Sequence, residues 1–103
     1  MATGISFKSK AANRLISPTT ITAPGTTGNQ TINQPAGRVN IAAGGTSIVV
    51  TNSLITANSI IMVSIATNDA TATVKSVVPT AGSFTINTAA VTAETAFSFV
   101  LLN

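Results

Sequence analysis

The chain has 103 residues, the size of a single domain, with a net charge of +3 and only 7% charged residues. A typical soluble domain has about 25% charged residues, so this surface is weakly protected against association. There is no Cys, His, Trp or Tyr, which excludes disulfides, thiolate or imidazole metal sites and the usual catalytic base. The composition fits a protein that is covered by neighbours, with an aggregation-prone chain as the alternative.

Residues 1–28 are predicted to form an extended N-terminal arm. Pro18 and Pro24 each remove a backbone donor, and the Thr-rich segment between them favours extended backbone. Three of the five cations, Lys8, Lys10 and Arg14, lie in the first 14 residues. Three charges are few for nucleic-acid binding, which neutralises many phosphates. We therefore expect a protein surface as the partner, with a solvated tail as the alternative.

Residues 29–103 have the pattern of a compact β-domain. Gln30 to Asn33 is a short candidate strand, ended by Pro35-Ala36-Gly37. Arg38 to Ala42 alternates polar and apolar residues. Ala43-Gly44-Gly45 then predicts a hairpin turn, because Gly readily takes positive φ, and Thr46 to Thr51 is the expected return strand.

Asn52 to Asn58 predicts an ordered loop in which Asn and Ser side chains bond the backbone. The next nine residues, Ser59 to Thr67, contain no charge, Gly or Pro and are rich in β-branched side chains. This near-continuous apolar run predicts a central strand buried on both faces. We expect one of the two surfaces that cover it to belong to another copy or another molecule.

The remainder predicts three more strands. Asn68 to Thr71 indicates a turn, and Thr73 to Val78 is a strand stopped by Pro79. Thr80-Ala81-Gly82 is a tight connection into the strand Ser83 to Thr88. The last strand is expected at Glu94 to Leu102.

About seven short strands spaced by 8–12 residues are typical of an all-β sandwich or jelly roll, here expected to be antiparallel. Phe84, Phe97 and Phe99 are the predicted large side chains of its core.

No catalytic constellation is visible in the sequence. Asp69 and Glu94 are the only carboxylates, and they fit a turn former and a surface charge. Lys75 is the only lysine of the expected β-domain. We therefore expect no enzyme activity, no cofactor and no metal. No apolar run reaches the length of a membrane-spanning helix, and the N-terminus lacks the apolar region of a signal peptide. We expect neither a membrane nor secretion.

Two other binding functions are weakly supported. A sugar-binding jelly roll usually stacks its ligand on Trp or Tyr, and the chain has neither. Ice binding requires Thr at a fixed repeat, and the Thr residues here follow no such period.

Four sequence segments in the C-terminal half resemble those of a known type of module. These are Val50 to Ser59 (VTNSLITANS), Ala66 to Thr71 (ATNDAT), Lys75 to Ile86 (KSVVPTAGSFTI) and Thr92 to Phe99 (TAETAFSF). Together they resemble a small β-module of tailed-bacteriophage virion proteins, found in capsid decoration (cement) proteins, head fibres and tail-fibre ends. The first 30 residues match no motif of this kind.

The resemblance implies a decoration protein that sits on the outer surface of the virion, staples neighbouring major capsid subunits, and is assembled in the host cytoplasm. It implies a homo-oligomer, expected to be a trimer, without direct nucleic-acid contact. A tail-fibre tip or adhesin that contacts the host surface is the alternative, but a fibre normally has a long shaft and none is seen here. We predict capsid contacts in the arm at Lys8, Lys10, Arg14 and Ile16. The predicted oligomer interface contains Ile61, Val63, Ile65, Phe97 and Phe99.

Overall fold

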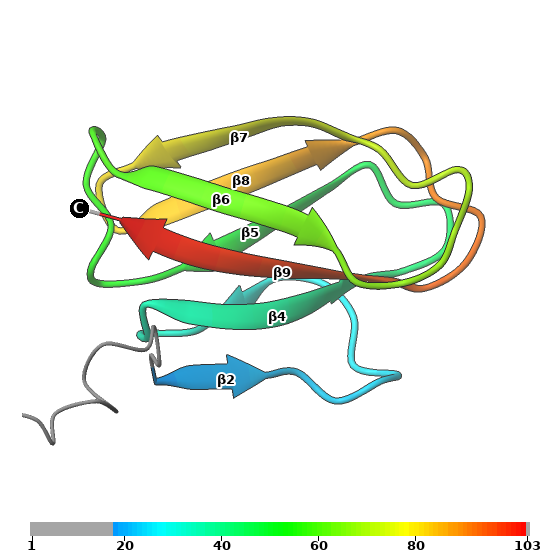
Figure 1. Ribbon diagram of the computed structural model, residues 1–103, viewed down its shortest axis with the longest axis horizontal. Coiled ribbons are helices and arrows are strands. Elements are labelled where there is room, and N and C mark those ends of the chain that lie inside the picture. The colour runs from blue at the N-terminus through cyan, green and yellow to red at the C-terminus, as the bar shows by residue number, and fades with distance from the viewer. Residues whose placement is uncertain (1–17, 103) are drawn as a thin grey trace, which may run out of the picture.

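Two four-stranded sheets pack face to face in the computed structural model, which describes residues 18–102 (Figure 1). The β9 sheet contains, in order across the sheet, β2 (Thr19–Ile21), β4 (Ala36–Ile41), β9 (Thr95–Leu102) and β6 (Ile60–Ile65). The β8 sheet contains, in order, β3 (Gln30–Thr31), β5 (Ser47–Thr51), β8 (Ser83–Thr88) and β7 (Val74–Thr80). The predicted all-β sandwich is confirmed. Within the described residues it has eight strands, because β2 forms inside the segment expected to be an arm.

Neighbouring strands are mostly antiparallel, but two short pairings are parallel. β2 pairs with β4, and β3 pairs with β5, in the parallel direction. Each of these pairings spans only two or three residues and adds a short strand to the edge of a sheet. The longer pairings of β9 with β4 and β6, and of β8 with β5 and β7, are antiparallel as predicted.

The chain changes sheet at almost every connection. In the described part of the chain, β7 and β8 form the one hairpin, closed at Gly82 with φ 84°. β4 and β5 lie in different sheets, so the predicted hairpin at Gly44-Gly45 is wrong (Figure 1). This loop crosses between the layers and is held by Val91, whose carbonyl accepts a hydrogen bond from Gly44 N–H. The crossing places the apolar faces of β4 and β5 on opposite sides of one core.

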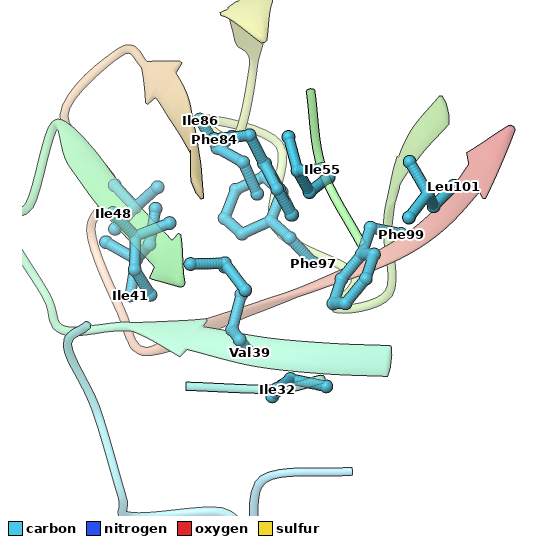
Figure 2. Packing of buried hydrophobic residues seen from close by; sticks show 12 residues of the cluster. Ile32, Val39, Ile41, Ile48, Ile55, Phe84, Ile86, Phe97, Phe99 and Leu101 are labelled. Atoms are coloured by element: carbon cyan, nitrogen blue, oxygen red, sulfur yellow. The ribbon is translucent and has the colours of Figure 1, made fainter. Parts of the chain in front are cut away.

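The core lies between the sheets and is filled by alternate residues of the central strands (Figure 2). Phe97 and Phe99 of β9 face Phe84 and Ile86 of β8, and all four are buried. The three predicted Phe anchors are therefore confirmed. Their alternation with the exposed or half-buried residues of the same strands follows the period of two of a β-strand.

The apolar run Ser59 to Thr67 forms a strand, but it is not the buried central one that the sequence predicted. β6 lies at the edge of the β9 sheet, and only Ile61 and Val63 pack against the core. Ile60 and Met62 point away from the core and are exposed. The central strand is β9, which pairs on both sides and carries two of the core Phe side chains. Apolarity predicted a strand here but did not determine its place in the sheet.

β7 continues through Pro79 to Thr80, so the prediction that Pro79 ends this strand is wrong. Pro79 is paired with Phe84 in the register of β7 and β8. β7 lies at a sheet edge, where the missing N–H of a proline faces solvent without a loss in the ladder. A shift of register between Val74 and Ser76 marks a second irregularity in the same strand.

The described part of the expected arm is attached to the β-domain. Beyond β2, Thr22 N–H donates to Arg38 O at 3.0 Å, and Gly28 N–H donates to Asn40 O at 3.0 Å. The fold therefore includes residues on both sides of the expected boundary at residue 28. The predicted capsid contacts Lys8, Lys10, Arg14 and Ile16 lie outside the described residues.

Candidate partner-binding surface

The face of the β9 sheet that points away from the β8 sheet, here called the outer face, is apolar at one end. The register of the strands places Ile60 of β6 opposite Leu102 of β9. The adjacent row crosses the whole sheet and consists of Met62, Val100, Ala36 and Thr19. None of these side chains carries a charge.

The large side chains at this end are open to solvent. Ile60 is 63% exposed, Met62 62% and Leu102 46%. On β2, at the other edge of the same sheet, Ile21 is 62% exposed. Single exposed apolar residues are common on proteins, but several gathered on one face of a sheet indicate a surface that contacts another molecule.

A shallow groove of about 220 Å³ crosses the outer face above β4. Ala36 on its floor is small and lies between Thr19 of β2 and the larger Val100 of β9, and Ile21 lines the groove beside Arg38. Arg38 lines one part of the groove, where its Nε donates to Ser98 Oγ at 3.0 Å. The groove is thus apolar along its floor and bordered by one fixed guanidinium.

The other end of the outer face is polar and is partly covered by the chain itself. Asn40 is buried, and its Nδ2 lies 3.0 Å from Ala23 O, 3.2 Å from Thr26 O and 3.3 Å from Thr22 O. Glu94 Oε2 accepts a hydrogen bond of 2.8 Å from Gly25 N–H. These contacts hold the loop of residues 22–28 over this end, beside a second hollow of about 290 Å³. The apolar end has no such cover among residues 18–102.

Asp69 joins its own loop to the start of β9 at one end of the sandwich. Its Oδ1 accepts from Thr71 Oγ1 at 2.6 Å and Thr71 N–H at 2.9 Å, and its Oδ2 accepts from Thr95 Oγ1 at 3.3 Å. These bonds, with the Thr71 hydroxyl as the largest cause, lower the pKa of Asp69 because they stabilise the carboxylate. The turn predicted at Asn68 to Thr71 lies one residue further along, closed by Ala72 N–H donating to Asp69 O at 3.1 Å. The side chain of Asp69 holds this turn through Thr71.

Residues 18–102 contain four ionisable side chains: Arg38, Asp69, Lys75 and Glu94. Within this range no three acidic, His or Cys side chains come together as a metal site would require. The described residues also include no helix with the length and apolarity needed to span a membrane.

The structure separates the five residues predicted for the oligomer interface into two groups. Phe97 and Phe99 are 0% and 1% exposed inside the core of this chain, so they offer no surface to a partner. Ile61 and Val63 are half-buried and Ile65 is 38% exposed, all three on the edge strand β6. The outer-face residues Ile21, Ile60, Met62 and Leu102 were not predicted as contacts. Alternation marks two faces of a strand, but it does not say which face remains uncovered.

Comparison of the chain with protein families, curated proteins and solved structures finds no match.

Proposed function

We propose that this chain is a decoration protein of a tailed-bacteriophage virion, which binds the outer surface of the capsid and holds neighbouring major capsid subunits together. The observation that carries the proposal is the uncovered apolar end of the outer face, formed by Ile60, Met62, Val100 and Leu102. The low charge of the chain and the resemblance of its C-terminal half to phage virion modules support the same function.

Burial of this apolar end against capsid subunits gives the binding energy, because removal of apolar surface from water is favourable by about 25 cal/mol per Å². The polar loops at the other end of the outer face then border the contact. Such a division into an apolar centre and a polar rim is usual at protein interfaces.

The N-terminal segment leads into β2, an edge strand of the same outer face. Thr19, at the start of β2, lies in the same row of the sheet as Ala36, Val100 and Met62. Residues 1–17 precede β2 in the sequence, and β2 lies at the edge of the outer face opposite Met62 of β6. We propose that Lys8, Lys10, Arg14 and Ile16 bind the same capsid surface, where they tie adjacent subunits together.

A truncation tests the role of the segment. It must end at residue 17, because a longer deletion would remove β2 from the sheet. We expect the truncated chain to fold and to sediment with empty phage heads more weakly than the full chain. Salt should weaken the full chain more than the truncated one, because exposed charge contacts are screened. Equal binding by both chains would show that the segment plays no part.

The position of the chain on the particle tests the function itself. Gold-labelled antibody against the chain, applied to purified phage particles from cells that produce it, should mark the head. Label at the tail would instead support the fibre-tip alternative, and unlabelled particles would contradict both.

A further inference from the structure

Four strands lie at sheet edges in the described part of the chain, and three of them are poor templates for another strand. β2 has three residues and β3 has two. β7 is longer, but it carries Lys75, Pro79 and a register shift between Val74 and Ser76. Short length, lysine, proline and bulges are the features by which natural sheets prevent pairing at their edges.

β6 has none of these protective features. Its six residues, Ile60 to Ile65, read Ile-Ile-Met-Val-Ser-Ile and contain no charge, Gly or Pro. They pair with β9 without any shift of register. β6 is therefore a long, regular and apolar edge, of the kind that accepts a further strand.

The ladder shows which backbone groups of β6 face the open edge. Ala66 N–H donates to Ala96 O at 2.8 Å, one position beyond the pair Ile65 and Phe97 and in the same register. In an antiparallel ladder, alternate residues bond one neighbour and the residues between them face the other way. The backbone groups of Ile61, Val63 and Ile65 therefore point away from β9, while their side chains point toward the β8 sheet.

We propose that β6 pairs with β6 of a second copy of this chain, in antiparallel orientation, with Val63 at the two-fold axis. Ile61 then lies opposite Ile65 of the partner subunit, and the three edge-facing residues of each chain bond one another. Ile61 and Ile65 lie two residues before and two residues after Val63. The open edge of one chain therefore matches the open edge of an identical chain in antiparallel orientation. The absence of charge means that two identical edges meet without repulsion, which favours a second copy as the occupant.

The pairing joins two β9 sheets into one continuous sheet of eight strands. Because the axis is perpendicular to the sheet, both outer faces point in the same direction. The dimer thus presents two apolar surfaces side by side, and two such surfaces bind a common target more tightly than one. The inference depends on the edge alone and stands independently of the capsid proposal.

Light scattering during gel filtration, over a range of protein concentrations, tests the pairing. The full chain should move from 10.3 kDa toward twice that mass as its concentration rises. Val63→Pro removes an N–H at the open edge and leaves the bonds to β9 in place, so it should weaken association about tenfold or more. Met62→Ala is the matched control, because it shortens an exposed side chain and keeps every backbone group.

The expected result is a dimer for the full chain and for Met62→Ala, and a folded Val63→Pro chain that is monomeric at the concentrations where the full chain is dimeric. A monomer at every concentration, or a Val63→Pro chain that dimerises as tightly as the full chain, would overturn the proposal. A trimer, as the resemblance to decoration proteins implied, would also overturn it.

A cross-linking experiment tests the register without proline. The chain has no Cys, and the proposed register places Met62 opposite Ser64 of the partner subunit. A mixture of Met62→Cys and Ser64→Cys chains should form a disulfide-linked dimer under mild oxidation, because directly opposite residues lie close enough for the bond. Each variant alone should link much more slowly. Equal linking in the separate and mixed samples would contradict the register.

Discussion

The rings of Phe84 and Phe99 meet edge to face, with centroids 5.0 Å apart and planes inclined by 64°. The two residues come from different sheets, β8 and β9, and both are fully buried. Their contact therefore joins the two layers at the middle of the sandwich (Figure 2). Edge-to-face geometry is favourable for aromatic rings because the positive edge of one ring approaches the negative face of the other.

Replacement of Phe84 should be among the most damaging changes in the core. Phe84→Ala leaves a cavity against Phe99 and should lower the free energy of unfolding by about 3–5 kcal/mol. Phe84→Leu fills more of the space and should cost markedly less. Urea denaturation followed by circular dichroism measures both, and a loss below about 1 kcal/mol for Phe84→Ala would contradict the packing described.

Gly37 is required by the close approach of β2 and Phe99. A Cβ at this position would lie 2.8 Å from Thr20 O and 2.9 Å from Phe99 Cε2. Gly37→Ala should therefore destabilise the chain by about 1–3 kcal/mol. If the ring causes part of the clash, the same change should cost less in a Phe99→Leu background. A double-mutant cycle measures this coupling. If the losses of unfolding free energy from Gly37→Ala and Phe99→Leu simply add, the whole cost of Gly37→Ala comes from the clash with the backbone of β2.

Asn40 is the buried anchor of the loop of residues 22–28. Asn40→Asp keeps the shape of the side chain but places carboxylate oxygens against the carbonyl oxygens of Ala23 and Thr26. We expect a loss of about 2–4 kcal/mol in unfolding free energy and faster proteolysis within the loop.

Asn87→Asp on β8 is the control for the same chemical change. Asn87 is half-buried and donates to Ser76 Oγ at 3.1 Å, a hydroxyl that can instead donate to a carboxylate. Asn87→Asp should lower the free energy of unfolding much less than Asn40→Asp does. Similar losses for the two variants would show that Asn40 does not anchor the loop.

Asp69 makes the stability of the chain dependent on pH in the acid range. Hydrogen bonds from Thr71 and Thr95 lower its pKa in the folded state, relative to about 3.9 in an unfolded chain. Its contribution is therefore complete above about pH 4 and is lost as the pH falls through the lower folded-state pKa. The midpoint of urea unfolding should decrease in this window.

Two variants check that Asp69 is the cause. Asp69→Asn should flatten the pH dependence below about pH 4, and Thr71→Val should reduce it because Thr71 Oγ1 is the closest donor. An unchanged pH profile in both variants would assign the acid sensitivity to another group.

Local patterns in the sequence predicted most strands and the core, because a period of two directly reports the two faces of a strand. Val39, Ile48, Phe84 and Phe97 could be assigned to the interior in this way. Partner choice between strands was not predictable from such patterns. The Gly44-Gly45 loop fits a hairpin locally, yet it crosses between sheets, because the choice depends on contacts far apart in the sequence.

The candidate surface was harder to predict for the same reason. Ile60 to Ile65 is apolar at nearly every position, so neither face could be identified as the uncovered one from the sequence. The pairing of Met62 with Val100 and Ile60 with Leu102 gives the answer, since β9 fixes which side of β6 faces the core. Sequence reasoning also placed Phe97 and Phe99 at once in the core and in the interface, and the structure assigns them to the core.

Binding of charge-substituted chains to empty phage heads tests the central claim that the apolar outer face attaches this protein to a capsid. Met62→Lys places a charge on the outer face, and Val78→Lys places the same charge on β7, where Val78 is similarly open to solvent. We predict saturable co-sedimentation for the unchanged chain and for Val78→Lys, and about tenfold weaker binding or worse for Met62→Lys. An unchanged chain that does not bind heads, or a Met62→Lys chain that binds as well as Val78→Lys, would contradict the account.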